Sequence, residues 1–472
     1  MEVRRRRRRR SRKPLLPLIG IMLVVLAVLI AVAVTLPDQP GDPTLQHTDP
    51  THTVTVPTNP TDPTATEPAP TEPPTEPPII KESTATLGVV GDILMHGEVI
   101  KSGYDSGTKT YNYDNIFPFI SEYIQKFDYA VGNMEGTLCG NDNGYIYDGY
   151  PHFNCPDPIA DALAKAGFDL MLTANNHSYD TRNTGFHRTL EILRNAGMDT
   201  LGTRSDADED NYLIKDLNGI KVGMICYTYN TGVKEDGSIY LNGIPLTLAN
   251  SQLTNSFNYD DLDGFYAKLS GELEEMEAAG AEATVLFIHW GDEYRLKPNN
   301  TQKKMAQALC DLGIDVIVGG HPHVVEPMAL LTSTKDENHK TACIYSLGNA
   351  VSNQRLGLIS ASKTAHTEDG LLVGITFAKY SDGSVVVESI DAMPLWVNMN
   401  KNHTSSKVYE IVPLDSDLPD WMVPFGLTEG QLDSCFESYN RTMDLIGTGM
   451  EEINNWFSQA QADLEEALGV KK

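Results

Sequence analysis

The sequence is poor in cysteine, with six among its 472 residues, and no two of them are spaced as Cys-x-x-Cys. Because zinc sites built from cysteine use such closely spaced pairs, a zinc site of that kind is not expected. Cys226, Cys310 and Cys343 each lie in an apolar stretch and are expected to be small core residues. Cys139 and Cys155 are the pair closest in sequence, and a disulfide between them is permitted outside the cytoplasm.

Basic residues are scarce relative to acidic ones. The chain has 36 Lys and Arg against 64 Asp and Glu, which gives a formal net charge of −28. Eight Arg, one Lys and one Glu lie among the first 13 residues, a net charge of +8, so the remainder of the chain carries −36. Nucleic acid is therefore not expected as a partner, because its phosphates need Lys and Arg. Such a charge favours solubility and repels anionic polymers.

The apolar run at residues 15–36 has 22 residues and no charged side chain. As a helix it is about 33 Å long, enough to cross a hydrocarbon core of about 30 Å. Residues 1–14 form a basic tail that should stay in the cytoplasm and leave the rest of the chain outside the cell membrane. The alternative is a cleaved signal peptide ending near Ala31-Val32-Ala33, but the run is longer than a signal core of about 7–15 residues. We therefore expect a single-pass anchor whose partner is the lipid bilayer.

Residues 37–84 are expected to be an extracytoplasmic linker. Residues 37–78 contain 13 Pro and 11 Thr, a composition that cannot bury apolar area and favours extended polyproline II. At about 3.1 Å per residue, such a segment reaches on the order of 100 Å. The domain that follows is thus expected to be held away from the membrane, as in a thick bacterial cell wall.

From residue 85 onward, apolar runs that end in Gly, Asn or His alternate with amphipathic stretches. Helices are expected at residues 158–166, 180–197, 263–279 and 301–312, and strands at 85–90, 129–131, 168–172, 283–288, 314–318, 341–347, 371–378 and 385–393. In the first helix, Asp157 is the expected N-cap, Pro158 the first helical residue and Gly167 the stop. This alternation predicts an α/β domain over residues 85–395 with helices outside. Residues 396–472 are expected to be a partly helical C-terminal extension.

Four of the expected strands end at residues that can bind a metal or transfer a proton: Asp92, His177, His289 and His321. In open α/β folds, binding sites form outside the carboxyl ends of strands, so these side chains are expected to gather at one site. Each also has a structural explanation when taken singly. Asp92 suits a turn, and a lone His after a strand is commonly a hydrogen-bonded core residue. Their joint occurrence favours a metal site.

The most specific element is His321-Pro322-His323. Proline biases the preceding residue to an extended conformation, so both imidazoles should project to one side. Asn133 and Glu135 are also two residues apart in an extended segment and should face one pocket. Asn175 and Asn176 follow a buried strand, although either could instead cap the next helix. Imidazole together with carboxylate and amide oxygens suits a divalent Zn, Mn or Fe ion.

Six ordered motifs span roughly residues 85–355: Gly91-Asp92-Ile93-Leu94-Met95, Gly132-Asn133-Met134-Glu135, Ala174-Asn175-Asn176-His177-Ser178-Tyr179-Asp180, His289-Trp290-Gly291-Asp292-Glu293-Tyr294, Gly320-His321-Pro322-His323-Val324-Val325 and Tyr345-Ser346-Leu347-Gly348-Asn349. Together they resemble the motifs of the CapA family of capsule (poly-γ-glutamate) synthesis proteins. The resemblance implies a fold similar to calcineurin-like metallophosphoesterases, a four-layer α-β-β-α sandwich with two mixed sheets between helices. It also implies a membrane-anchored component of poly-γ-glutamate synthesis or export, with other polyglutamate synthase subunits as partners.

The resemblance further implies roles for individual residues. The role of metal ligand falls on Asp92, Glu135 (or Asn133 in its place), Asn176, His289, His321 and His323, that of proton donor on His177, and that of substrate binding on Asn133, Asn175, Glu293 and Asn349. The chain departs from the metallophosphoesterase pattern twice. Leu94 stands where those enzymes have a His, and Gly132-Asn133-Met134-Glu135 replaces their Gly-Asp-x-x-Asp. Less ligand charge is expected to weaken or alter a two-metal site.

Three hypotheses about function follow. The first is a surface protein of polyglutamate capsule synthesis or of a related envelope-polymer system, with a metal-type pocket. The second is a metal-dependent phosphoesterase or amide hydrolase, in which water is the nucleophile and His177 the general acid. The third is a binding module that keeps the fold without the chemistry.

Overall fold

The computed structural model describes residues 79–142, 144–400, 408–414 and 426–467, all within a compact unit that spans Glu76–Lys472. The fold is mixed α/β, as the sequence predicts. The predicted membrane helix at residues 15–36 and the linker as far as residue 78 lie outside the described residues. Among the helices that are described, none combines the length and the apolar character needed to cross a membrane.

The first sheet has eight strands: β1 (Lys81–Ile93), β4 (Tyr129–Met134), β5 (Leu170–Leu172), β6 (Asp199–Leu201), β16 (Asn349–Val351), β17 (Asp369–Tyr380), β18 (Val385–Asn400) and β19 (Val408–Pro413). Their order is β19-β18-β17-β1-β4-β5-β6, and β16 pairs with the end of β1. The strands β1, β4, β5 and β6 are parallel, whereas β17, β18 and β19 join in antiparallel pairs. The carboxyl ends of β1, β4 and β5 therefore lie at one edge.

The second sheet has seven strands: β7 (Tyr212–Leu217), β8 (Ile220–Tyr229), β11 (Ser256–Phe257), β12 (Ala283–His289), β13 (Val316–Gly320), β14 (Val325–Thr332) and β15 (Lys340–Leu347). Their order is β11-β8-β12-β13-β15-β14, with β7 paired to β8. The strands β8, β12, β13 and β15 are parallel, and β14 is antiparallel to β15. The carboxyl ends of β12 and β13 thus lie side by side.

The remaining elements are helices and short hairpins. They are α2 (Gly97–Ser102), β2 (Tyr104–Asp105), β3 (Thr110–Tyr111), η1 (Asp114–Ile116), α3 (Ser121–Ile124), α4 (Pro158–Ala166), α5 (Arg182–Asn195), β9 (Tyr240–Leu241), β10 (Ile244–Pro245), α6 (Leu248–Gln252), α7 (Leu262–Ala278), α8 (Asn300–Cys310), η2 (Ala365–Glu368) and α10 (Glu429–Ala467). The predicted helices at 158–166, 263–279 and 301–312 correspond to α4, α7 and α8 within two residues at each end.

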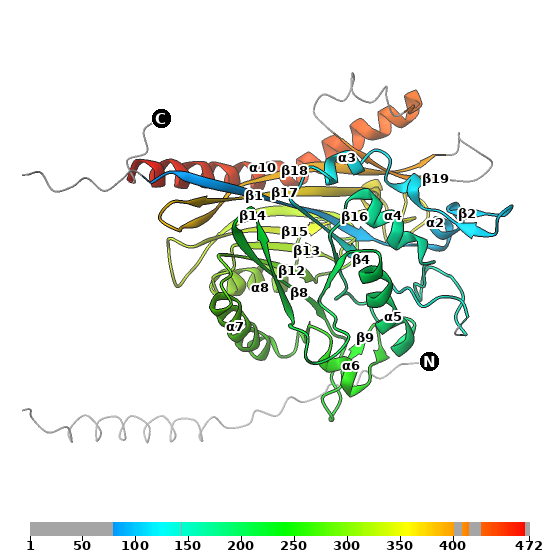
Figure 1. Cartoon of the computed structure of the whole chain (residues 1–472). Helices are drawn as coiled ribbons and strands as arrows, with labels where there is room; N and C mark the ends of the chain where they lie inside the picture. The colour runs from blue at the N-terminus through cyan, green and yellow to red at the C-terminus, as the bar shows by residue number, and fades with distance from the viewer. Residues whose placement is uncertain (1–78, 143, 401–407, 415–425, 468–472) are drawn as a thin grey trace, which may run out of the picture. The chain divides into compact units, whose positions relative to one another are not determined.

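Three buried clusters define the layers (Figure 1). One core lies between the two sheets and includes Val89 of β1 and Phe287 of β12. A second core joins the other face of the first sheet to α4 through residues such as Leu163. A third joins the other face of the second sheet to α7 and α8, through Leu269 and Met305. Helices thus cover the outer faces, as strands that alternate with helices predict.

The ends of α4 test the expected capping. The helix begins at Pro158 and stops at Gly167, whose φ of +108° favours glycine. Asp157 stands at the N-cap position, as predicted, but its side chain makes no capping hydrogen bond. Its carboxylate instead forms a two-point ion pair with Arg188 of α5, at 2.6 Å for each contact. A bidentate pair with Arg outcompetes a local cap because both partners are charged.

The C-terminal residues belong to the main body. The strand β18 continues past residue 395 to Asn400, and β19 pairs with it. The helix α10 lies against β18 and β14, and its Ile446, Ile453 and Phe457 join the core between the sheets. Figure 1 shows this red helix running along the edge of the layers. The first strand, β1, begins at Lys81, four residues before the predicted start at residue 85.

The end of β1 fits tightly between its neighbours. Asp92 is paired with Asn133 of β4 on one side and with Asn349 of β16 on the other. A Cβ on Gly91 would lie 2.0 Å from the carbonyl oxygen of Gly348, so only glycine permits this approach. The backbone amide of Asp92 donates to that same carbonyl at 3.0 Å. This close packing fixes the position of the Asp92 carboxylate.

Candidate metal centre and adjoining cleft

Asp92 lies at the centre of a cluster of buried polar side chains at the strand ends. One carboxylate oxygen accepts a hydrogen bond from Nδ2 of Asn133 at 2.8 Å. The other accepts from the backbone amide of His321 at 3.3 Å and lies 3.1 Å from Nδ1 of His323. Burial opposes ionisation, but the hydrogen bond and charge of His323 outweigh it and hold the pKa of Asp92 below its usual value. Asp92 is therefore an ionised carboxylate that ties the two sheets together.

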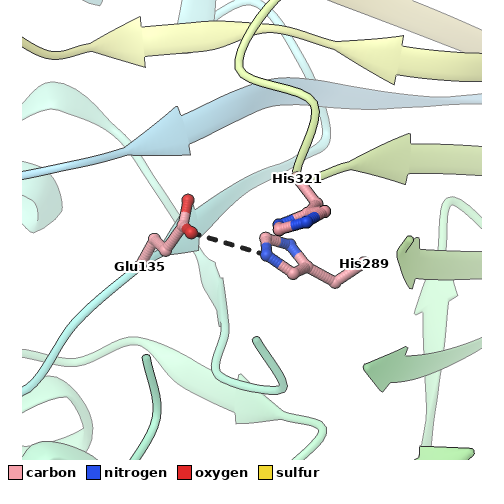
Figure 2. Close-up of side chains that lie close together, drawn as sticks. All are labelled: Glu135, His289 and His321. Carbon is pink, nitrogen blue, oxygen red and sulfur yellow. Dashed lines mark ion pairs between the residues drawn. The ribbon is translucent and has the colours of Figure 1, made fainter. Parts of the chain in front are cut away.

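Glu135 follows β4 and is completely buried, with an exposed fraction of 0%. Neither of its carboxylate oxygens has a hydrogen-bond partner among the described residues. Oε1 lies 3.4 Å from Nε2 of His289 and 3.8 Å from Nε2 of His323. Figure 2 shows this carboxylate pointing at the imidazoles of His289 and His321. A buried carboxylate without a hydrogen bond is costly, so this group is poised to bind a ligand.

His289 ends β12 and lies deep between the sheets. Its Nε2 is 2.8 Å from Oδ1 of Asn176, a residue from the loop after β5 in the other sheet. Its ring packs against that of His321, with centroids 4.8 Å apart. The Asn176 amide also donates from Nδ2 to Asn242 at 3.4 Å. The predicted ligands Asn176 and His289 therefore meet from opposite sheets.

The His321-Pro322-His323 loop differs from its predicted conformation. The expectation that His321 is extended is wrong: its φ is +96°, and that of His323 is +56°. The loop turns back sharply after β13, because its backbone must reach both Asp92 and Tyr294, whose amide donates to the Pro322 carbonyl. Positive φ in these residues stores strain, which is typical of functional sites. The rings still lie near each other, 6.0 Å between centroids.

The two imidazoles of this loop have opposite electrostatic environments. Burial, reinforced by the neighbouring imidazoles, lowers the pKa of His321 well below its ordinary value. Burial also disfavours charge on His323, but Glu135 and Asp92 outweigh it and raise the pKa of His323 to about 9. His321 is thus a neutral imidazole, and its Nδ1 has no hydrogen-bond partner among the described residues. A neutral imidazole with an open nitrogen is the form that binds metal.

The cluster fits a divalent cation. Three overlapping groups have ligand atoms that all lie within 4.8 Å of one another: Glu135 with His289 and His321, Asp92 with Glu135 and His323, and Glu293 with His321 and His323. Glu135 and His321, which carry these atoms without hydrogen-bond partners, belong to these groups. Imidazole and carboxylate ligands suit Zn, Mn or Fe. Because Glu135 belongs to the first two groups, it could contact either of two adjacent ions.

His177 forms a separate pair beside the cluster. Its Nδ1 lies 2.7 Å from Oδ2 of Asp180, and its ring packs edge-on against Phe153 at 4.7 Å. Burial opposes protonation, but the hydrogen bond to Asp180 and its charge outweigh it and raise the pKa of His177. Nδ2 of Asn242 lies 3.4 Å from both ring nitrogens. The pair thus holds a proton that His177 can donate.

The other amide side chains predicted at the site make hydrogen bonds to neighbouring residues of the protein. Asn175 donates from Nδ2 to Oδ1 of Asn133 at 3.1 Å and to the carbonyl of Met134 at 2.9 Å, so neither it nor Asn176 caps a helix. Asn349 is fully buried, and its Nδ2 donates to the carbonyl oxygens of His323 and Thr367. These amides hold Asp92 and the His323 loop in place. Glu293, by contrast, is exposed at the mouth of the cluster.

A cleft of about 670 Å³ adjoins the cluster and is lined by His177, Asp180 and Glu293. Sequence reasoning missed Asp180 as a site residue and treated it as the start of a helix. Its spacing of three from His177 was the available signal. It also missed Asn242, which reaches the site from the turn between β9 and β10. The Asn242-Gly243 pair indicates a turn, but nothing in the sequence indicates that this turn meets His177.

Comparison with known proteins adds a family relationship. Residues 86–354 match the family described as bacterial capsule synthesis protein PGA_cap. The chain is 30% identical over 272 residues to the capsule biosynthesis protein CapA of Bacillus anthracis, covering 57% of this chain and 60% of that protein. It is 28% identical over 305 residues to the PGA biosynthesis protein CapA of Bacillus subtilis (strain 168), covering 64% of this chain and 70% of that protein. The match therefore includes every residue of the buried cluster.

Proposed function

The chain belongs to the bacterial capsule synthesis protein PGA_cap family, and on that premise we propose that it acts in the synthesis or export of poly-γ-glutamate or a related cell-envelope polymer. The observation that carries the proposal is the coincidence of the family match with the site. The matched segment, residues 86–354, contains all the strand ends that form the cluster, from Asp92 to Asn349. The two similar proteins of Bacillus bear names that refer to capsule and PGA biosynthesis.

We further propose that the protein is anchored in the cell membrane by residues 15–36, with residues 1–14 in the cytoplasm. The uncharged apolar run and its basic flank support this topology. The linker that precedes β1, which begins at Lys81, would then hold the folded body outside the membrane. In that position the body could meet a polymer, and other subunits of a polyglutamate synthase, on the outer surface.

The charge of the chain constrains how such a polymer could be handled. The chain after residue 13 carries a formal charge of −36. An anionic polymer would be repelled by this charge unless bound cations lie between the two. The carboxylate and imidazole cluster could supply one such cation at the site itself. Processing at a metal centre is therefore easier to reconcile with the charge than binding along the surface.

The test is deletion of the gene, followed by measurement of surface poly-γ-glutamate. Polymer should be lost, and it should return with the wild-type gene but not with Glu135→Gln. Glu274→Gln, at an exposed position of α7, is the matched control and should restore the polymer. Unchanged polymer in the deletion strain would remove the capsule function from this protein.

A second candidate function is that of a metal-dependent hydrolase of phosphoesters or amides, built on the four-layer metallophosphoesterase type of sandwich. The paired sheets with outer helices are compatible with that architecture. The specific observation in its favour is the His177–Asp180 pair, which faces the cleft. Nearby lies Glu135, whose carboxylate has no hydrogen-bond partner among the described residues. A divalent cation held by Glu135 and the imidazoles would polarise a carbonyl or phosphoryl oxygen.

Two residues of the chain would have separate roles in that reaction. Asp180 orients the His177 ring through Nδ1, and His177 would donate its proton to the departing oxygen or nitrogen. The test is a screen of phosphoesters and γ-glutamyl amides with added Mn or Zn. His177→Ala should abolish turnover while the metal content, measured by elemental analysis, stays unchanged. Binding of these compounds without turnover in the wild type would instead point to a non-catalytic module.

A further inference from the structure

The helix α10 lies beyond residues 86–354, the segment that matches the family, yet it packs against elements that adjoin the candidate metal centre. It contacts β18, η2 and β14, and β14 begins just after His323 (Figure 1). Its buried residues recur every three or four positions or at multiples of that spacing, as in an amphipathic helix. They are Cys435, Ser438, Thr442, Ile446, Ile453 and Phe457. The face is apolar from Ile446 onward, whereas the turns before it include buried polar residues.

The polar turns of α10 hold the carboxylate of Asp369, the first residue of β17, which has an exposed fraction of 0%. Oδ1 of Asp369 accepts a hydrogen bond from Oγ of Ser438 and another from Nη2 of Arg441, each at 2.6 Å. Oδ2 accepts a third from Nε of Arg441, also at 2.6 Å. A two-point pair of this kind fixes the direction of a carboxylate as well as its position.

The backbone beside Asp369 packs directly on Gly348 and Asn349. A Cβ on Gly348 would lie 2.7 Å from the carbonyl oxygen of Asp369 and 3.0 Å from the backbone nitrogen of Val325. Gly370 pairs with Gly348, and a Cβ on Gly370 would lie 2.2 Å from the carbonyl oxygen of Asn349. Because the backbones are in contact, a shift of Asp369 cannot be absorbed locally and must move Gly348 and Asn349.

Gly348 and Asn349 in turn contact two of the predicted metal ligands. The carbonyl oxygen of Gly348 accepts a hydrogen bond from the backbone amide of Asp92 at 3.0 Å. Nδ2 of Asn349 donates to the carbonyl oxygens of His323 at 3.2 Å and Thr367 at 3.0 Å. The contacts that begin at α10 therefore end at Asp92 and His323. Metal ligands must be held to within about 0.5 Å, so a small displacement of this backbone matters.

A purely structural role explains the Arg441–Asp369 pair poorly. A buried ion pair contributes little net stability compared with well-packed apolar side chains of similar volume. The same helix already has apolar anchors in the core between the sheets, through Ile446, Ile453 and Phe457. The pair adds what these anchors lack, which is a directional contact that fixes where β17 begins.

We propose that Arg441 is a positioning residue, through which α10 holds Asp92 and His323 in the arrangement that binds a divalent cation. Arg441 acts through Asp369 and the backbone of Gly348 and Asn349. The inference rests on the metal centre of the proposed function and adds to it a part of the chain that the family match does not include. It predicts that losing the pair weakens metal binding in protein that remains folded.

Titration of the full-length chain in detergent with Mn, followed by electron paramagnetic resonance of the free ion, tests this proposal. Arg441→Met should raise the Kd for Mn by at least about tenfold, the lower end of the effect seen when groups behind metal ligands are changed. The double variant Arg441→Met with Asp369→Asn should bind Mn no more weakly than Arg441→Met alone. Both substitutions remove the same contact, so their effects should not add.

Ile453→Ala is the matched control. It removes a fully buried side chain from the same face of α10, about 18 Å further along the helix, and does not touch Asp369. Like Arg441→Met, it should lower the urea midpoint in the presence of chelator. Its Kd for Mn should stay unchanged, because a loss of global stability does not alter the affinity of molecules that remain folded. Ser438→Ala is a milder variant that leaves Arg441 in place, and it should raise the Kd by about threefold.

An unchanged Kd in folded Arg441→Met, or an equal rise in Ile453→Ala, would overturn the proposal. If Arg441→Met does not fold, Ser438→Ala decides, and an unchanged Kd in that variant has the same consequence. Wild type that binds no Mn would remove the metal centre and this inference with it. Normal binding by wild type with no effect of the variants would remove the positioning role alone, so the two failures can be told apart.

Discussion

Replacement of one buried acid outside the site, Glu326→Gln, should change how stability depends on pH. Glu326 lies in β14 with an exposed fraction of 0%. One of its oxygens accepts a hydrogen bond from Nε2 of Gln302 at 2.8 Å, and the other has no hydrogen-bond partner among the described residues. Burial raises the pKa of Glu326 to about 8. The folded protein therefore keeps this carboxyl protonated well above the pH at which an unfolded chain would release the proton.

The direction and the size of the change in folding stability follow from the difference between the pKa values of Glu326 in the folded and unfolded states. The ordinary pKa of a Glu is 4.5, and the folded value is about 8. Below about pH 4.5 both states are protonated, and the group imposes no penalty on folding. As the pH rises towards 8, the unfolded state alone gains free energy by ionising. The loss of folding stability approaches about 5 kcal/mol, because each pKa unit is worth about 1.4 kcal/mol. Glutamine at this position cannot ionise and removes the effect.

The pH dependence of the free energy of unfolding is measured by urea unfolding of wild type and Glu326→Gln at several pH values, in the presence of chelator. Near pH 5 the variant should be about 1–3 kcal/mol less stable, because its amide buries an additional unpaired N–H. Near pH 8.5 it should be more stable than wild type by about 2–4 kcal/mol, since the ionisation penalty is gone. The exposed Glu337→Gln is the control and should leave the pH profile unchanged. A stability difference that stays constant between these pH values would refute the reasoning.

Three further changes test the site and its support. Mn or Zn at about 100 times its dissociation constant should stabilise wild type by about 2.7 kcal/mol in thermal unfolding, and Glu135→Gln should abolish this gain because Glu135 belongs to two of the ligand groups. Asp180→Asn should lower any hydrolytic rate by about 100-fold without changing bound metal, since it removes the group that raises the pKa of His177. Arg441→Met should cost about 3–5 kcal/mol in urea unfolding, because it leaves Asp369 buried without its two 2.6 Å contacts.

Much of the fold could be predicted because its signals are local. The helix α4 has Pro158 at its start and Gly167 at its end, and both act within one turn of the chain. The core strands are apolar runs that end at polar residues, and this pattern predicts β12 and β13. The sheet to which each strand belongs was not predictable. That assignment depends on pairings such as Asp92 with Asn349, which are far apart in sequence.

In the candidate site, too, some residues could be predicted from the sequence and others could not. The meeting of Asp92, His289 and His321 could be predicted, because parallel strands deliver their carboxyl ends to one edge. The cleft could not be predicted, because its residues come mainly from loops such as the one containing Ser360. The path of a loop is set by contacts that have no periodic pattern in the sequence. For the same reason the left-handed backbone of His321 could not be anticipated from the proline that follows it.

The case for a ligand at the cluster is energetic as well as geometric. A carboxylate buried without a hydrogen bond costs several kcal/mol, and Glu135 has no such bond from any described residue. If the cluster served only to stabilise the fold, apolar side chains of similar volume would do so at lower cost. His321, in the same cluster, also leaves Nδ1 without a hydrogen-bond partner among the described residues. One divalent cation would contact both the Glu135 carboxylate and Nδ1 of His321. The neighbouring side chains His289 and Asn176 could not satisfy these two groups instead, because they already bind each other at 2.8 Å.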